Sequence, residues 1–313
     1  MELYLPAILA FVVALVAGRV FIPALHQLKF GQAIREEGPQ GHLKKAGTPT
    51  MGGLIFLTGI LFSVLAYRLF HPAVLFVVVS MLAFGSLGFL DDYLKVVKKH
   101  NLGLRAKHKL AGQLLFSVVL AIWAGHLFGT SIRIPFITYQ LDLGLVYYPF
   151  FVFVAVAVTN AVNLTDGLDG LSSSVTIVVL SFFAWASFAV GIPVLQVLAL
   201  IMIGGLLGFL VYNRYPAKVF MGDLGSLALG GAVTGFAFAT GLVLLIPIVG
   251  LIYFVETLSV MIQVASFKMT GKRVFKMAPI HHHFELSGWN EVKIVMVFSI
   301  VTVVMSIVGI LSL

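Results

Sequence analysis

Residues 72–92 read PAVLFVVVSMLAFGSLGFLDD, an apolar run of nineteen residues followed by two aspartates. A helix needs about 20 apolar residues to cross the hydrocarbon core of a bilayer, so this run predicts a transmembrane helix. The aspartates follow where such a helix meets water. An acid at a membrane mouth keeps its charge while it faces lipid headgroups, so the stretch predicts a membrane protein with an acidic group at one surface.

The composition of the whole chain agrees with this prediction. Of its 313 residues, 60% are hydrophobic and 10% are charged, and the mean hydropathy is +1.08. Soluble domains carry about 25% charged residues, so a soluble globular protein is excluded. Cysteine is absent, which excludes disulfides and thiolate metal sites. Only Glu2 precedes the first apolar run, so we expect a retained helix and not a signal peptide.

The same template predicts about ten transmembrane helices, and therefore an all-α polytopic membrane protein. Their approximate ranges are 3–24, 51–70, 72–90, 110–128, 147–162, 171–190, 194–212, 226–243, 246–267 and 292–311. No repeat of fixed period is present, so one integral-membrane domain over residues 1–313 is expected. Between two predicted helices, residues 131–148 carry β-branched and aromatic residues in a partly alternating pattern, which predicts a short hairpin.

Lysine and arginine determine the expected orientation. They gather in alternate loops, whereas the opposite loops hold only Arg68 and Arg133. The gathered set comprises Lys29, Arg35, Lys44, Lys45, Lys95, Lys98, Lys99, Arg105, Lys107, Lys109, Arg214, Lys218, Lys268, Lys272, Arg273, Lys276 and Lys293. Because cytosolic loops carry the excess of positive charge, we expect both termini and the hairpin on the outer, periplasmic side. The acidic groups described next then lie on the cytosolic face.

Asp91 and Asp92 are the first candidate functional group. Negative charge at the C-terminal end of a helix opposes the helix dipole. Adjacent carboxylates also raise each other's pKa unless a cation neutralises them. The nearby Lys95 or a divalent metal would supply that cation. A solvated helix end is the alternative, but it does not explain the unfavourable charge.

The segment NLTDGLDG, residues 163–170, is the second candidate. It holds Asp166 and Asp169 with no Lys or Arg beside them. A continuing helix would put Asn163 on the same face as both acids, while the two glycines favour an irregular turn. An ordinary interhelical turn is the alternative. Such a turn does not require two uncompensated carboxylates, so the segment is interpreted as functional.

Asp223 is the third candidate, in the segment before the eighth predicted helix. Mg²⁺ is usually held by one or two carboxylates and by substrate phosphate oxygens, so Asp223 is a sufficient protein ligand. Capping of the following helix is the alternative role. Phe220, three residues earlier, either stacks on a base or packs in the core. The lysines of this face would attract a diphosphate substrate.

Histidines and one buried acid complete the candidates. His281, His282 and His283 are consecutive and cannot converge on one point of a regular element, so donation to a phosphate is favoured over a zinc site. Glu256 lies inside a predicted transmembrane helix, where an acid is a functional candidate or a protonated packing partner. Gln263 lies two turns further along the same face.

Five strings resemble those of the bacterial phospho-N-acetylmuramoyl-pentapeptide-transferase family, in the order expected of it. They are Thr48-Pro49-Thr50-Met51-Gly52-Gly53, Asp91-Asp92-Tyr93, Asn163-Leu164-Thr165-Asp166-Gly167-Leu168-Asp169-Gly170, Met221-Gly222-Asp223-Leu224-Gly225-Ser226 and Pro279-Ile280-His281-His282-His283-Phe284-Glu285. The resemblance runs from about Lys45 to Glu285. One string alone would be weak, but five in order form a specific signature.

The resemblance implies a bacterial inner-membrane enzyme. It would transfer phospho-N-acetylmuramoyl-pentapeptide from its UDP-linked form to undecaprenyl phosphate with Mg²⁺, giving lipid I and UMP. It implies that Asp223 is the Mg²⁺ ligand and that Asp91 and Asp92 activate or orient the lipid phosphate. Covalent attack by a carboxylate and direct attack by the lipid phosphate both remain open. A homodimer is also implied, and a nucleic-acid partner is not.

The resemblance further assigns residues to the nucleotide substrate. Uridine would be held by Asp169, Phe220, Asn213 and Gln263, with Lys45 and Asn163 nearby. The remaining assigned residues are Lys109 or the neighbouring Lys107 toward the diphosphate, and Lys95, Asp166, His281, His282 and His283 toward the substrate.

Three rival functions are weighed against this one. A sister enzyme would pass N-acetylglucosamine phosphate to the same lipid, but the string at 281–284 is typical of the muramoyl branch. A prenyl transferase with a DDxxD motif would need an acid at position 95, which is Lys95. An ion-coupled transporter would place acids along a pathway, whereas here they gather on one face.

Overall fold

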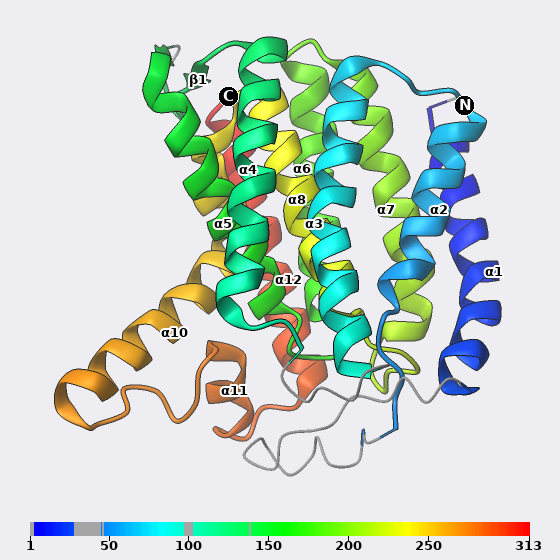
Figure 1. Cartoon of the computed structure of the whole chain (residues 1–313), viewed down its shortest axis with the longest axis vertical. Helices are drawn as coiled ribbons and strands as arrows, with labels where there is room; N and C mark the ends of the chain where they lie inside the picture. The colour runs from blue at the N-terminus through cyan, green and yellow to red at the C-terminus, as the bar shows by residue number, and fades with distance from the viewer. Residues whose placement is uncertain (1–2, 28–44, 46, 97–102, 138) are drawn as a thin grey trace.

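The computed structural model describes residues 3–27, 45, 47–96, 103–137 and 139–313, and it is mostly helical (Figure 1). The helices are α1 (Leu5–Gln27), α2 (Gly53–Ala66), α3 (Pro72–Val96), α4 (Ala106–Phe128), α5 (Tyr147–Thr165), α6 (Leu171–Ala189), α7 (Pro193–Asn213), α8 (Gly222–Thr240), α9 (Ile246–Val249), α10 (Leu251–Thr270), α11 (Ile280–Glu285) and α12 (Glu291–Leu311), with 3₁₀ turns η2 (Gly144–Val146) and η3 (Val243–Leu245). The predicted helical membrane architecture is confirmed.

Among the described residues, eight helices are long and apolar enough to cross a membrane: α1, α3, α4, α5, α6, α7, α10 and α12. The predicted ranges 51–70 and 226–243 correspond to α2, which has 14 residues, and α8, which has 19. The range 246–267 is divided at Gly250 between α9 and α10. The total of ten spans stays a prediction.

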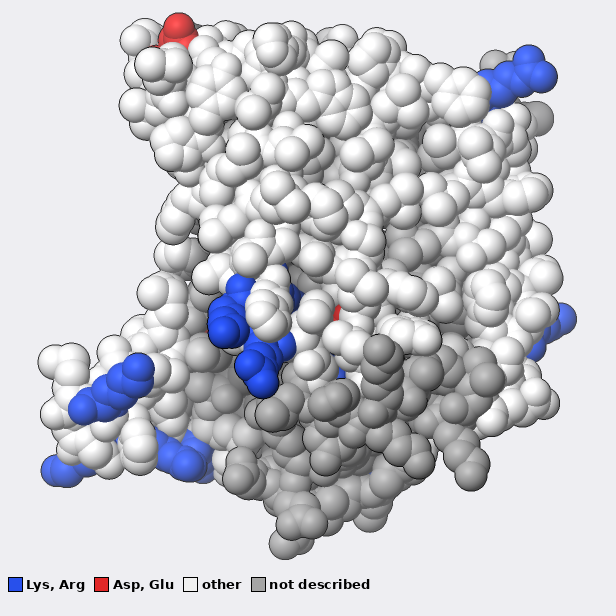
Figure 2. Space-filling view, in the orientation of Figure 1, with Lys and Arg blue, Asp and Glu red and all other residues white. Residues whose placement is uncertain are grey.

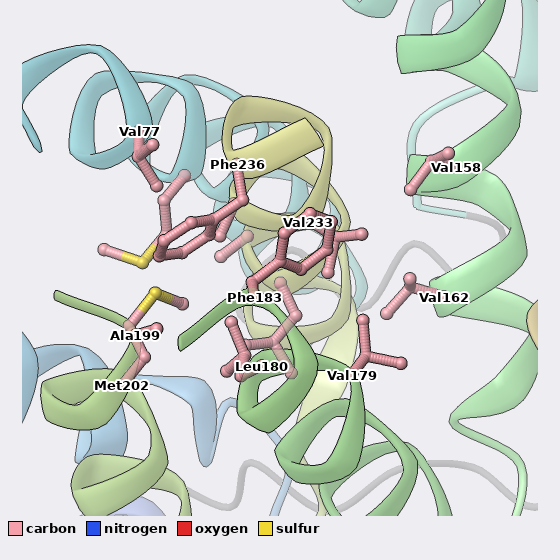
Figure 3. Packing of buried hydrophobic residues seen from close by; sticks show 14 of the residues in the cluster. Val77, Val158, Val162, Val179, Leu180, Phe183, Ala199, Met202, Val233 and Phe236 are labelled. Carbon is pink, nitrogen blue, oxygen red and sulfur yellow. The ribbon is translucent and has the colours of Figure 1, made fainter. Parts of the chain in front are cut away.

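Helix α8 is the central helix of the bundle. Five glycines and one aspartate lower its hydropathy, yet every residue from Leu224 to Thr240 is buried. A helix surrounded by other helices does not need a lipid-facing apolar stripe. Side chains of neighbouring helices converge on it (Figure 3). One example is the stacked pair of Phe183 and Phe236, whose ring centroids lie 5.6 Å apart.

The contact between α3 and α8 is the most extensive in the bundle. A Cβ atom on Gly88 would lie 2.0 Å from the backbone oxygen of Asp223, and one on Gly231 would lie 2.5 Å from that of Ser80. Only glycine permits this approach of the two backbones. The contact brings the C-terminal end of α3 beside the N-terminal end of α8.

The two ends of the bundle differ. The predicted hairpin is confirmed, with β1 (Ser131–Arg133) antiparallel to β2 (Gln140–Asp142). It lies at the same end as the C-terminus, while α11 lies at the opposite end and α10 leans away from the bundle (Figure 1). Figure 2 shows an uncharged band across this face, with most of the visible Lys and Arg below it, near the start of α4 and along the far part of α10. Lys29, Arg35, Lys44, Lys98 and Lys99 lie outside the described residues.

Candidate active site

The last turns of α3 and the first turn of α8 bring Asp91, Asp92 and Asp223 together. The apolar run ends at residue 90, but α3 continues to Val96, so both aspartates lie on the helix. Lys95 follows one turn later. Its Nζ lies 2.8 Å from Asp91 Oδ2 and 2.8 Å from Asp223 Oδ2. One lysine therefore bridges acids of two helices that lie far apart in the sequence.

A second lysine reaches Asp223 from the first turn of α4. The Nζ of Lys109 lies 3.1 Å from Asp223 Oδ2 and 3.7 Å from Asp91 Oδ2. Lys107 is exposed. We define Asp91, Asp92 and Asp223 as the acidic cluster. The structure thus places Lys109, and not Lys107, in contact with this cluster.

Backbone and amide donors fix the three carboxylates. Asp91 Oδ1 accepts from the backbone N–H of Leu104 at 2.6 Å, and Asp92 Oδ2 accepts from that of Leu224 at 3.0 Å. The latter N–H lies in the first turn of α8, where it has no partner within the helix, so Asp92 satisfies it. Gly222, at φ +78°, leaves room because a Cβ there would lie 2.6 Å from Asp92 Oδ2.

Asp223 is not the cap of α8. The N-cap position is Met221, and it makes no side-chain capping bond. Asp223 Oδ1 instead accepts from Asn163 Nδ2 at 2.8 Å, and the same amide lies 2.8 Å from Ser226 Oγ. The capping alternative is therefore wrong, and Asn163 belongs to the acidic cluster and not to the group around Lys45.

The segment between α5 and α6 forms an irregular turn, as its glycines favour. Helix α5 ends at Thr165, and Gly170 has φ 76°. Asp166 lies in this turn with part of its surface exposed. Desolvation raises the pKa of Asp166 well above its ordinary range, and repulsion by Asp223, Asp92 and Asp169 raises it further. Asp166 therefore holds its proton more tightly than an ordinary aspartate does.

Lys45 joins three distant parts of the chain. Its Nζ lies 2.7 Å from Asp169 Oδ1 and 2.6 Å from Glu291 Oε2, which is in the first turn of α12. The ammonium also lies 5.8 Å from the centroid of the Tyr215 ring. Burial alone would lower the pKa of Lys45, but hydrogen bonds and charge from Asp169 and Glu291 outweigh it and raise this pKa. We call Lys45, Asp169 and Glu291 the lysine-centred cluster.

The α7–α8 segment lies next to this cluster. Asp169 Oδ2 accepts from the backbone N–H of Ala217 at 2.9 Å. Asn213 is buried and donates to the Val219 carbonyl at 3.0 Å. Phe220 is half-buried, and its backbone N–H donates to the Pro49 carbonyl at 2.8 Å. The strings at 48–53 and 221–226 are thereby joined, and Asn213 and Phe220 lie in the segment that binds Asp169.

The three consecutive histidines have different partners. His281 Nδ1 lies 3.0 Å from Glu256 Oε2, and His282 Nδ1 lies 2.6 Å from Glu285 Oε2. His283 Nδ1 accepts from the backbone N–H of Lys276 at 3.2 Å. They do not converge on one point, as expected for consecutive residues.

Gln263 is occupied by the segment that follows α10. Its Oε1 accepts from the backbone N–H groups of Val274 and Phe275 at 3.0 and 2.9 Å. Its Nε2 donates to the Phe275 carbonyl at 2.9 Å. The amide therefore holds a local turn and is not joined to the lysine-centred cluster, so its assignment to uridine stays a prediction.

Two residues of the site were not predicted. Ser226 lies beside Asn163, and Glu291 pairs with Lys45. An acid in the first turn of a helix is common because it complements the helix dipole, so nothing in the local sequence marks Glu291. Its pairing with a lysine 246 positions earlier is visible only in the fold.

The acidic cluster offers oxygen donors of the kind that Mg²⁺ prefers. Among the described residues, no group of three or more His, Asp or Glu side chains is arranged to hold a metal. One or two carboxylates with substrate phosphates suffice for Mg²⁺, so the donor chemistry around Asp223 fits this ion. Lys95 and Lys109 neutralise the same oxygen of Asp223 in the structure.

Comparison with known proteins identifies the family of the chain. Residues 74–241 match the model of glycosyl transferase family 4, and residues 45–57 match phospho-N-acetylmuramoyl-pentapeptide-transferase signature 1. A phospho-N-acetylmuramoyl-pentapeptide-transferase of Clostridium botulinum is 55% identical over 98% of this chain and 95% of its own. One of Carboxydothermus hydrogenoformans is 56% identical over 96% of both chains. The chain belongs to the phospho-N-acetylmuramoyl-pentapeptide-transferase family.

The matches to the family cover both clusters. The signature at 45–57 contains Lys45, and the family 4 range contains the three aspartates of the acidic cluster. The histidines and Glu291 lie beyond that range, but the full-length relatives span them. The family resemblance of the five strings is thus confirmed, while the role of each residue stays a prediction.

Proposed function

We propose that this protein transfers phospho-N-acetylmuramoyl-pentapeptide from its UDP-linked donor to undecaprenyl phosphate. An oxygen of the lipid phosphate forms a bond to the phosphorus next to the sugar. The bond from that phosphorus to the bridging oxygen breaks, and UMP leaves with that oxygen. The main support is the acidic cluster with its two lysines at one end of a membrane bundle, in a chain that belongs to this family.

The lysine-centred cluster is proposed to hold the uridine end of the donor. Asp169 and Lys45 offer an acceptor and a donor, and Glu291 holds the lysine against Asp169. Phe220 and Asn213 lie on the segment that donates to Asp169 through Ala217. Two fixed charges and a half-buried ring are suited to orient a nucleobase.

The acidic cluster is proposed to carry the transfer. Lys95 and Lys109 turn from Asp223 to the diphosphate and neutralise its charge, while Asp91 and Asp92 orient the acceptor phosphate. Asp223 would hold Mg²⁺, which when bound neutralises phosphate charge. His281, His282 and His283 are proposed to face the substrate, with His281 at the Asp166–Gly167 turn and Lys107 at the surface.

The same proposal includes the membrane location, the orientation and the oligomeric state of the enzyme. The enzyme lies in the bacterial inner membrane with the acidic cluster at the cytosolic face and both termini outside. This orientation is supported by the gathering of Lys and Arg at one end of the bundle, near the start of α4 and along α10 (Figure 2). A homodimer is proposed from the family resemblance alone.

UMP release tests this function directly. Detergent-solubilised protein receives undecaprenyl phosphate, Mg²⁺ and either the UDP-muramoyl-pentapeptide donor or UDP-N-acetylglucosamine. We expect release only with the muramoyl donor, and loss of release in a folded Asp223→Asn variant. Release only with the other donor would assign the chain to the sister activity. Full activity of the variant would remove Asp223 from the metal site.

A further inference from the structure

Glu256 and His281 form a buried polar pair outside both clusters. His281 Nδ1 lies 3.0 Å from Glu256 Oε2, and the two side chains are 1% and 0% exposed. Glu256 comes from α10, within a candidate membrane span, and His281 from α11. Burial of two ionisable groups is costly, so such a pair is a functional candidate.

In the described part of the chain, each side chain of the pair has one polar atom without a hydrogen-bond partner. Among the described residues, no group forms a hydrogen bond with Glu256 Oε1 or His281 Nε2. Most buried polar atoms have a partner, so this exception requires an explanation. His281 Nε2 lies against the turn between α5 and α6, because a Cβ on Gly167 would be 2.2 Å from it. The imidazole therefore connects α10 with the residue that follows Asp166.

The charge of a buried pair determines where its protons lie. A buried group that is both charged and uncompensated is strongly unfavourable, which favours a pair of zero net charge. Three arrangements meet this condition: an ionised Glu256 with a doubly protonated His281, a protonated Glu256 that donates to Nδ1 of a neutral His281, and a protonated Glu256 that accepts from Nδ1–H of a neutral His281. In the first two, Nε2 carries a proton and is a hydrogen-bond donor toward the turn; in the third, Nε2 carries none.

We propose that Glu256 is a positioning residue that keeps a proton on His281 Nε2 and directs this N–H to an acceptor oxygen at the Asp166–Gly167 turn. That oxygen belongs either to the carboxyl group of Asp166 or to the diphosphate of the substrate. The second source rests on the proposed function. Second-shell carboxylates likewise fix the orientation of a histidine ring.

Kinetics test whether the two residues act as a unit. We expect Glu256→Gln and His281→Gln each to lower kcat about 10- to 100-fold, the usual cost of losing an outer-shell partner. The kcat of the double variant should be no lower than that of the more impaired single variant, because the second substitution removes no additional interaction. Ser259→Ala is the control, since this buried serine of α10 donates to the backbone carbonyl of Glu256 and not to its side chain. Additive losses would overturn the proposal.

Nitrogen-15 NMR of histidine-labelled protein tests the proton directly and does not depend on turnover. The His281 signals are those lost in His281→Gln. We expect a protonated Nε2 in the wild type and a mixture of tautomers in Glu256→Gln; an unprotonated wild-type Nε2 would overturn the proposal. A hydrogen-bonded Nε2–H without nucleotide would identify Asp166 as the acceptor, and one that forms only with the UDP-linked donor would identify the diphosphate. An inactive wild type with protonated Nε2 would refute the proposed function alone.

Discussion

Each acid of the acidic cluster has a cation or a fixed donor in the structure. Lys95 and Lys109 share one oxygen of Asp223, and Asn163 holds the other. A lysine between two carboxylates forms ion pairs that a diphosphate can replace, because the diphosphate offers oxygens of the same charge. Under the proposed function, substrate binding is therefore an exchange of anions around lysines that are already in place.

Lys109 and Lys107 form a natural matched pair of variants. We expect Lys109→Met to lower UMP release about 100-fold, because removal of one donor that stabilises developing charge costs about this much. Lys107→Met should stay within about threefold, since an exposed charge contributes little. The measurement is kcat under saturating substrates, with melting temperature as a check on folding. Equal losses of kcat in both variants would contradict the proposed role of Lys109 in stabilising charge.

The chemistry of single residues was largely predictable, but their partners were not. Paired aspartates at a helix end and uncompensated acids in a turn indicated a site because each is unfavourable unless something compensates it. The choice between Lys107 and Lys109 depends on the position of α4 relative to α3, which spacing alone does not determine. The bonds of the Gln263 amide to Val274 and Phe275 were not predictable either, and its assignment to uridine, which the family resemblance implies, stays a prediction.

At the scale of elements, the contact of α3 with α8 determines the distance between Asp91 and Asp223. Gly88 allows that contact because a Cβ there would lie 2.0 Å from the Asp223 backbone oxygen. Backbone atoms cannot move away from an added Cβ atom, whereas the end of a flexible side chain can. A glycine one turn before Asp91 and Asp92 thus permits the spacing of the acidic cluster.

Gly88→Ala tests this spacing. Overpacking typically costs about 1–3 kcal/mol, so we expect a lower melting temperature in detergent together with loss of UMP release. Ser86→Ala, an exposed position on the same helix, is the control and should match the wild type. A stable and fully active Gly88→Ala protein would show that the helices separate at no cost.

The first turn of α12 contributes Glu291 to the lysine-centred cluster. We expect Glu291→Gln to raise KM for the UDP-linked donor about fivefold, because a partly exposed ion pair is worth at most about 1 kcal/mol. The value of kcat should change little. Val292→Ala, an exposed neighbour, is the control. A fall in kcat with an unchanged KM would instead place Glu291 near the transferred phosphate.

At the scale of the whole molecule, hydropathy predicted helices better than it predicted their surroundings. Most predicted spans correspond to long helices, but α8 is central and buried, and α2 has only 14 residues. A window of hydropathy cannot distinguish a helix in lipid from one surrounded by protein. The departure of α10 from the bundle was not predicted either, because it depends on packing and not on composition.

The orientation of the bundle can be tested because the chain contains no cysteine. Ser131→Cys lies in the hairpin, and Lys272→Cys lies after α10; both positions are exposed. We expect a membrane-impermeant maleimide to label Ser131→Cys in intact spheroplasts and Lys272→Cys only after permeabilisation, as the distribution of positive charge predicts. The reverse pattern would place the acidic cluster outside the cell.

The ion pair between Lys45 and Glu291 also bears on how the protein is made. It joins a residue before α2 to the first turn of the last helix. A chain that is still on the ribosome, with α12 not yet inserted, holds its three aspartates but lacks Glu291, one of the two acids that pair with Lys45. The lysine-centred cluster is therefore completed only when the last helix enters the membrane.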